Sequence, residues 1–206
     1  MEFSKAISLN PANLAGETTN SLNPFVNCKY ELVKLSNVCD LNKFKNQASP
    51  EKISTMNLYK GNVKLLPSSQ NYDWWTNEII AGEYINEGGV IALGVARYAN
   101  IKKHKGKFVS ANNKLISIKQ DIDILFDYVY LLLEIYAQNL YKSGSQYPQF
   151  DTKKFNEFQI PLPPLESQQK IISVIESIES KITNLEHLTH NFESKKQEIL
   201  KEALKS

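Results

Sequence analysis

The chain has 206 residues, of which 42% are hydrophobic and 22% are charged, with a formal net charge of +2. This composition is typical of a globular protein with a core of its own and excludes a wholly disordered chain. With only Cys28 and Cys39, no signal-peptide segment and no apolar run long enough to cross a bilayer, we expect a soluble cytoplasmic protein without disulfides.

The first 27 residues are rich in Asn, Ser, Thr and Ala and show no sustained hydrophobic period. They predict a tail or linker. Residues 28–164 predict one mixed α/β domain. Its first segment, 30–38, has recurring apolar residues that fit either a strand or a short helix, and a short apolar run, 63–66, ends at Pro67.

Three further segments of the domain have the apolar and β-branched residues typical of strands. They are 83–96, 107–109 and 115–118. In the first of them, a turn at Gly88-Gly89 is expected to precede the apolar run 90–93.

A helix is predicted to begin with Asp121 as its capping residue and to end at Ser143-Gly144-Ser145. Its apolar residues recur at intervals of three and four, as in a helix with one buried face. They are Ile124, Leu125, Tyr128, Val129, Leu132, Ile135 and Tyr136. Strands that precede a helix without regular alternation favour the α+β fold class over a doubly wound sheet.

The last segment, 165–206, predicts one long helix, because no glycine or proline follows Glu166. Its seam positions follow 4-3 spacing and are mostly large and apolar. They are Ile171, Ile175, Ile178, Ile182, Leu185, Thr189, Phe192, Lys196, Ile199 and Ala203. Such a helix needs another helix to cover its stripe, and the two polar seam positions favour an antiparallel coiled coil, or mixed packing, over a simple parallel zipper. The alternative is a helix that folds back on its own domain.

Known catalytic and cofactor motifs are missing from the sequence. It has no glycine-rich phosphate loop, no G-x-S-x-G and no H-E-x-x-H. His187 and His190 stand three residues apart on the predicted long helix, where a solvated face is favoured over a metal site. We therefore expect neither catalysis nor a metal in this chain.

The segment from Gly88 to Gln120 contains no Asp or Glu but is rich in basic residues. These are Arg97, Lys102, Lys103, Lys105, Lys107, Lys114 and Lys119. Lysines near phosphates give sequence-independent affinity for nucleic acid, whereas arginine and asparagine pair with base edges in the major groove. The segment thus predicts a DNA-binding surface, with a merely solvated hairpin as the alternative.

Several segments resemble the specificity subunit of type I restriction-modification systems. They are 30–38, 106–109 with Ala111-Asn112-Asn113, 143–150 with Phe155 and Phe158, and 160–165 followed by Glu166, Gln168 or Gln169 and Ile171-Ile172. The likeness covers about residues 28–206 and is most specific at 160–165 with its following helix. The chain departs from the family at Gly88-Gly89, where the family often has glycine followed by an acidic residue.

The resemblance implies a target recognition domain over 28–164 and a spacer helix over 165–206. A complete specificity subunit carries two such domains and two long helices that pair antiparallel, whereas this chain carries one of each. It therefore resembles a half-subunit, or the recognition region of a type IIG-like fusion. We expect a homodimer through the helix and a bipartite target, with docking on a modification subunit as the alternative.

The implied function is sequence-specific binding of double-stranded DNA by a subunit that directs methyltransferase and endonuclease subunits to their target. S-adenosylmethionine, ATP and magnesium are expected in those partner subunits and not in this chain. The alternative function is a coiled-coil assembly scaffold without DNA readout.

Candidate site residues fall into three groups. The expected phosphate contacts are Lys102, Lys103, Lys105 and Lys107. The expected contacts to base edges are Arg97, Tyr98, Asn112 and Asn113, and the loop with Ser145 and Gln146 is expected to bind DNA in the same groove. The expected helix-pairing residues are Ile171, Ile175, Ile178, Ile182, Leu185, Phe192 and Ile199.

Overall fold

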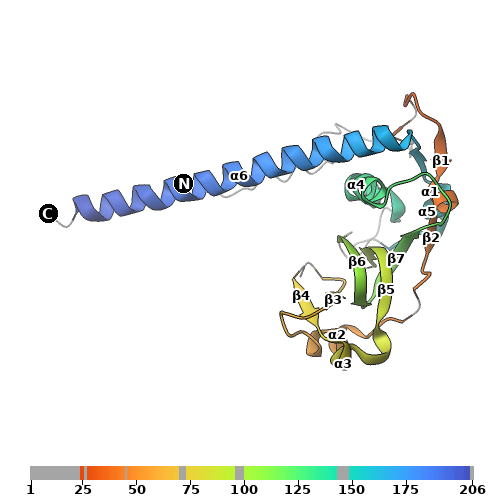
Figure 1. Ribbon diagram of the computed structural model, residues 1–206, viewed down its shortest axis with the longest axis horizontal. Helices are drawn as coiled ribbons and strands as arrows, with labels where there is room; N and C mark the ends of the chain where they lie inside the picture. The colour runs from red at the N-terminus through yellow and green to blue at the C-terminus, as the bar shows by residue number, and fades with distance from the viewer. Residues whose placement is uncertain are drawn as a thin grey trace. The chain divides into compact units, whose positions relative to one another are not determined.

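The computed structural model describes residues 24–25, 27–44, 46–69, 73–95, 100–142 and 149–204 (Figure 1). Most of the predicted tail lies outside these residues. The chain divides into two compact units between Pro163 and Pro164. Among the described residues, no helix is both long enough and apolar enough to span a membrane.

The first unit is built on a six-stranded sheet with the order β2-β7-β5-β6-β3-β4. Its strands are β2 (Cys39–Leu41), β3 (Val63–Leu66), β4 (Trp74–Thr76), β5 (Asn86–Gly94), β6 (Ile101–Ser110) and β7 (Asn113–Ile118). β3 runs parallel to β6, and the other neighbours are antiparallel. This mixed sheet, together with helices that do not alternate regularly with the strands, confirms the predicted α+β fold class.

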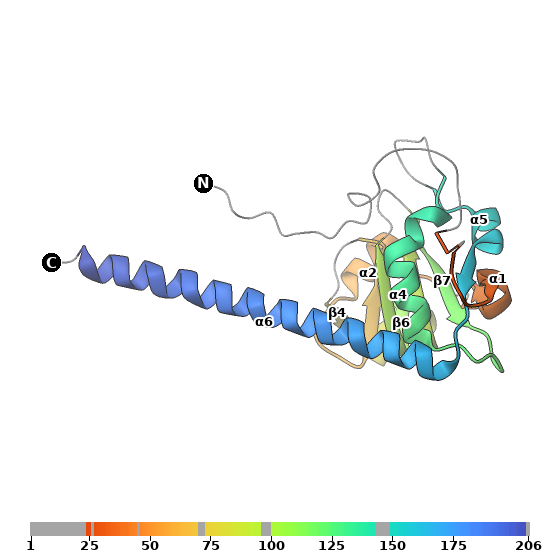
Figure 2. The same cartoon turned by 90° about the horizontal axis from the view of Figure 1, so that it is seen from above.

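Buried side chains lie on both faces of the sheet. On one face Val90 and Ala92 of β5 pack in a cluster with Leu66, Phe108 and Leu115. The other face carries helix α4 (Phe126–Tyr136), which lies across the strands in Figure 2. A second cluster joins Val63 and Leu65 of β3 to helices α2 (Pro50–Thr55) and α3 (Glu78–Ala81). The 3-10 helix η2 (Gly82–Tyr84) links α3 to β5.

The Gly88-Gly89 pair lies inside β5, so the predicted turn at this position is wrong. Gly88 has a φ of +143° and pairs across the strands with Gly106, whose φ is +119°. A Cβ atom on Gly88 would lie 3.1 Å from the ring of Phe44. Glycine is therefore required here by backbone conformation and close packing, without any reversal of the chain.

Helix α4 begins at Phe126, and the prediction that Asp121 caps it is wrong. The capping position is Leu125, whose side chain makes no capping hydrogen bond. Asp121 instead has a φ of +60°, a conformation that aspartate tolerates in tight turns. After Tyr136 the chain continues as the 3-10 helix η3 (Ala137–Leu140), and the predicted helix end at 143–145 lies outside the described residues.

A two-stranded sheet joins the two ends of the first unit. β1 (Leu32–Lys34) pairs antiparallel with β8 (Gln159–Pro161), and helix α5 (Thr152–Glu157) precedes β8. Helix α1 (Leu35–Val38) follows β1, so the segment 30–38 forms both of the elements its pattern allows.

The second unit is helix α6 (Leu165–Ala203), which has 39 residues and confirms the predicted long helix. At about 1.5 Å per residue it is about 58 Å long. Most apolar side chains of the predicted seam are exposed along this helix, and Ile175 is half-buried. The exposed ones are Ile171, Ile178, Ile182, Leu185, Phe192 and Ile199. Pairing of this stripe with another helix stays a prediction.

Candidate nucleic-acid interface

Strand β6 carries the row of lysines that the sequence predicts as phosphate contacts. Because side chains alternate along a strand, Lys103, Lys105 and Lys107 project from one face and Lys102 from the other. The first group therefore lies on the face that α4 covers, whereas Lys102 lies on the face of Val90 and Ala92. The structure thus separates one predicted phosphate contact from the other three.

One carboxylate holds two of these lysines. Asp127 accepts hydrogen bonds from the ammonium groups of Lys103 and Lys105, each at 2.8 Å. Burial raises the pKa of Asp127, but the bonds from the two lysines outweigh burial and hold the pKa below its usual value. Each ammonium also lies over an aromatic ring of α4, at 4.5 Å from the centroid of Tyr130 and 4.8 Å from that of Phe126. Both lysines are thereby held beside α4.

The third lysine of this face has a carboxylate partner of its own. Lys107 donates to Oε2 of Glu78 at 2.8 Å, and Asn62 donates to Oε1 of the same group at 2.8 Å. The bond from Lys107, followed by that from Asn62, lowers the pKa of Glu78. Neither Glu78 nor Asp127 lies in the acid-free segment 88–120, so the sequence offers no signal that they neutralise it.

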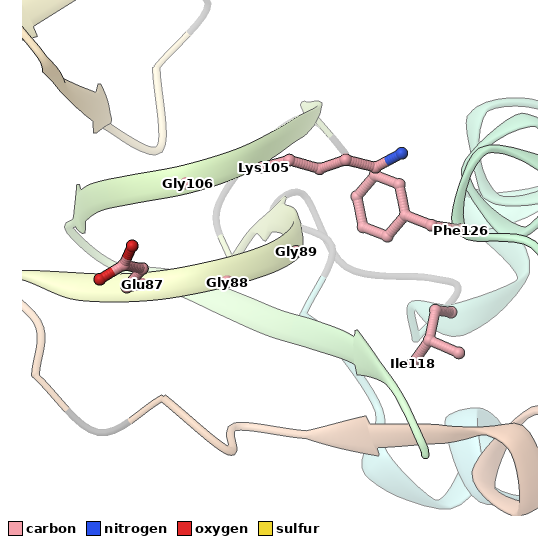
Figure 3. A pocket seen from close by; sticks show the side chains of 7 residues that line it. All are labelled: Glu87, Gly88, Gly89, Lys105, Gly106, Ile118 and Phe126. Atoms are coloured by element: carbon pink, nitrogen blue, oxygen red, sulfur yellow. The ribbon is translucent and has the colours of Figure 1, made fainter. Parts of the chain in front are cut away.

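An open hollow of about 500 Å³ lies beside Lys105. Figure 3 shows its lining residues: Glu87, Gly88, Gly89, Lys105, Gly106, Ile118 and Phe126. Three of them are glycines, and the space beside Gly89 is taken up by the ring of Phe126. Within the described part of the chain, no group of three or more His, Cys, Asp or Glu side chains is placed to hold a metal ion.

Lys102 is buried, with only 5% of its surface exposed. Its ammonium donates to the backbone carbonyls of Pro67 and Ser69, in the connection that follows β3. Burial, and after it the charge of Lys64, lowers the pKa of Lys102 to about 8. Since the ammonium faces carbonyl oxygens inside the protein, this placement differs from the solvent-facing phosphate contact that the sequence predicts.

The connection after β3 is held by side chains along its whole described start. Four consecutive carbonyls, from Leu66 to Ser69, accept hydrogen bonds from Asn113, Lys102, Asn100 and again Lys102. The bond from Asn113 is 2.7 Å long and that from Asn100 is 3.0 Å. Connections that are far apart in the sequence therefore meet at this row of carbonyls.

Two more contacts bring further connections to the same place. The buried hydroxyl of Tyr141 donates to the carbonyl of Gly94, the last residue of β5, at 2.6 Å. The backbone N–H of Val95 donates to the carbonyl of Asn112 at 3.5 Å. We call this region the loop end; it is where the described starts of the connections that follow Leu66, Gly94, Ser110 and Tyr141 come together.

Two of the residues predicted to contact DNA, Asn112 and Asn113, are described at the loop end. Asn112 is exposed in the turn between β6 and β7, with a φ of +55°. Asn113 is buried, and its amide bonds the carbonyls of Leu66 and Ala111 and the hydroxyl of Ser110. The other four lie outside the described residues, in segments whose described flanks belong to the loop end: Arg97, Tyr98, Ser145 and Gln146.

The buried ammonium of Lys102 predicts that protein stability depends on pH. The usual pKa of 10.5 applies in the unfolded chain and a pKa of about 8 in the folded protein. Between these values the unfolded chain binds more protons, so the free energy of unfolding rises with pH. We expect the free energy of unfolding, measured in urea, to rise by about 1 kcal/mol from pH 7 to pH 9. In Lys102→Met this rise is expected to be absent. An equal pH dependence in the two proteins would show that the ammonium is not buried.

Comparisons with known proteins give one family. The model of the type I restriction modification DNA specificity domain matches residues 27–193. One similar structure comes from a study of complex assembly and conformational transition of the type I R-M system. The match covers 90% of this chain and 46% of the other, with 17% sequence identity and a TM-score of 0.59. The match to the type I restriction-modification S subunit from M. genitalium covers 78% of this chain and 42% of that subunit, with 13% sequence identity and a TM-score of 0.53. The match to the HsdS subunit from Thermoanaerobacter tengcongensis covers 84% of this chain and 42% of that subunit, with 18% sequence identity and a TM-score of 0.50.

At these identities the similar structures establish the fold alone. The chain spans less than half the length of each of the three. A comparison with the sequences of curated proteins gives no match. The family model, in contrast, extends over most of the sequence, through the whole first unit from residue 27 and far into α6. The chain therefore belongs to the family of type I restriction-modification DNA specificity domains.

Proposed function

We propose that the chain binds a specific sequence of duplex DNA with its loop end and directs methyltransferase and endonuclease subunits to that sequence. The observation that carries the proposal is the convergence, at the loop end, of the described starts of four connections, three of which hold the predicted DNA contacts. Specific recognition requires side chains to be held at fixed positions against base edges, and segments that converge can present their side chains to one groove.

In this proposal, base edges are read by Arg97, Tyr98, Asn112, Ser145 and Gln146. Phosphates are bound by Lys103, Lys105 and Lys107, which exchange a carboxylate of the protein for a phosphate of the DNA. Their side chains are 40%, 61% and 35% exposed, so a phosphate has access to each of them. In the same proposal Lys102 and Asn113, whose side chains are buried, support the loop end.

We further propose that α6 pairs antiparallel with α6 of a second copy. The exposed apolar seam is long enough to need a helix of equal length, which a second copy supplies. Two copies related by a twofold axis present two equal reading surfaces, so the target is a bipartite palindrome. Methyl transfer and cleavage, with S-adenosylmethionine, ATP and magnesium, belong to the modification and restriction subunits, and we place the assembly in the cytoplasm.

The test is selection of DNA by the full chain, alone and with its modification subunit. The probe is a pool of duplexes with a randomised core, sorted by retention on the protein at moderate salt. We expect one bipartite motif to be enriched and the retention to fall as salt rises, because lysines that bind phosphates release counterions.

A coiled-coil scaffold without DNA readout gives a different result in this selection. The chain would then pair through α6 but enrich no motif at any salt concentration, with or without the modification subunit. That outcome would contradict the proposed function.

A further inference from the structure

We propose that Lys102 is a positioning residue for target recognition, which holds two connections of the loop end in one fixed arrangement and does not itself touch DNA. The inference rests on the proposed function, because it concerns how the reading surface is held. It starts from the two carbonyls, of Pro67 and Ser69, to which the Lys102 ammonium donates.

These contacts join neighbouring ends of different connections. Lys102 is the second residue of β6, and Pro67 is the first residue after β3. Asn100, just before β6, adds a bond to the carbonyl of Ser68. The carbonyl of Asn100 in turn accepts a bond of 3.0 Å from the N–H of Gly94. The start of the β3–β4 connection is therefore tied to both ends of the β5–β6 connection.

A lysine is a costly choice for this position. The side chain pairs across the strands with Ala92 and is almost completely buried, and a second ammonium, that of Lys64, lies near enough to lower its pKa. An apolar side chain of similar length avoids the burial of a charge. It lacks, however, the donors that reach two carbonyls at once. Proteins keep such unfavourable groups mainly where function requires them.

The function that this arrangement serves is specificity. Base readout requires that side chains from separate loops be held within a fraction of an ångström, whereas phosphate binding by exposed lysines tolerates movement. Loss of the Lys102 donors is therefore expected to weaken discrimination between DNA sequences. Affinity for DNA of any sequence depends on other lysines and is expected to persist.

The matched pair of variants is Lys102→Met and Lys103→Met. Both remove one ammonium from neighbouring residues of β6, one inside the loop end and one from the exposed row. The full chain and each variant are used to sort the same randomised duplex pool and to retain the unsorted pool at low salt. We expect Lys102→Met to lower enrichment of the wild-type motif at least tenfold and to change low-salt retention less than about twofold. Lys103→Met is expected to lower retention and keep the motif.

Folding of the variants is checked by thermal unfolding, where a midpoint within about 4 °C of the wild type is expected. Lys102→Gln keeps donors on a shorter side chain and is expected to recover part of the motif enrichment. If Lys102→Met enriches the wild-type motif fully, or only lowers low-salt retention as Lys103→Met does, the inference is overturned.

Amide hydrogen exchange tests the arrangement independently of DNA. The N–H groups of Gly94 and Ala111 donate to the carbonyls of Asn100 and Leu66, at the ends of the two connections. Faster exchange of these two amides in Lys102→Met supports the role of Lys102 in holding the connections, and unchanged exchange overturns it. A wild-type chain that enriches no motif overturns the proposed function instead, and the exchange result distinguishes the two failures.

Discussion

Replacing Ile178 and Ile182 with aspartate is expected to turn a dimer of this chain into a monomer. Both side chains are exposed on α6, in the seam that we propose pairs with a second copy. Burial of an isoleucine side chain is worth about 1.5 to 3 kcal/mol, and a symmetric pair loses four of them. The dissociation constant is therefore expected to rise at least a thousandfold, as measured by light scattering or sedimentation.

The matched control places the same two charges, at the same spacing, on the opposite side of the helix. Ser180→Asp with Asn184→Asp adds two aspartates away from the seam, and this variant is expected to remain a dimer. A wild-type chain that is monomeric at all concentrations contradicts pairing with a second copy. If both double variants dissociate equally, the effect arises from charge or helix propensity and the seam is not the interface.

The parts of the fold that follow from local periodicity are predictable from the sequence. The seam of helix α6 keeps 4-3 spacing with only two polar positions, and the apolar runs of β3 and β7 lie within their strands. Strand β6 begins at Ile101, well before the predicted start at Lys107. Its first half contains three lysines, and the partners of Lys103 and Lys105 are Asp127, Tyr130 and Phe126 of α4. Lysines that are covered by a helix from another part of the sequence give the strand no apolar pattern by which it could be predicted.

The candidate site is predictable in composition and not in arrangement. The sequence identifies the basic segment, but Lys102 and Lys103 have opposite surroundings although they are neighbours in the chain. Their difference depends on the pleat of β6 and on Pro67 and Asp127, which lie far from them in the sequence. Glycine pairs such as Gly88-Gly89 are equally ambiguous, because glycine serves both turns and close packing within strands.

Replacing Asp127 with asparagine is expected to strengthen binding to DNA of any sequence. Asp127 is the shared carboxylate partner of Lys103 and Lys105, so a neutral amide leaves both ammonium groups available to phosphates. Two additional phosphate contacts steepen the dependence of log affinity on log salt by about 2. We expect about tenfold tighter binding of a non-target duplex at low salt, measured by a fluorescence titration at several salt concentrations.

Glu134→Gln is the matched control, because it removes one negative charge from the same helix. Glu134 accepts a hydrogen bond from Tyr130 at 2.8 Å, whereas the carboxylates that pair with the lysines of β6 are those of Asp127 and Glu78. The control is expected to change affinity by less than about twofold, as a general change of net charge does. If Asp127→Asn binds no more tightly than this control, the β6 lysines do not contact phosphate. The positive charge that the proposal needs would then have to come from the connections of the loop end, whose single arginine is Arg97.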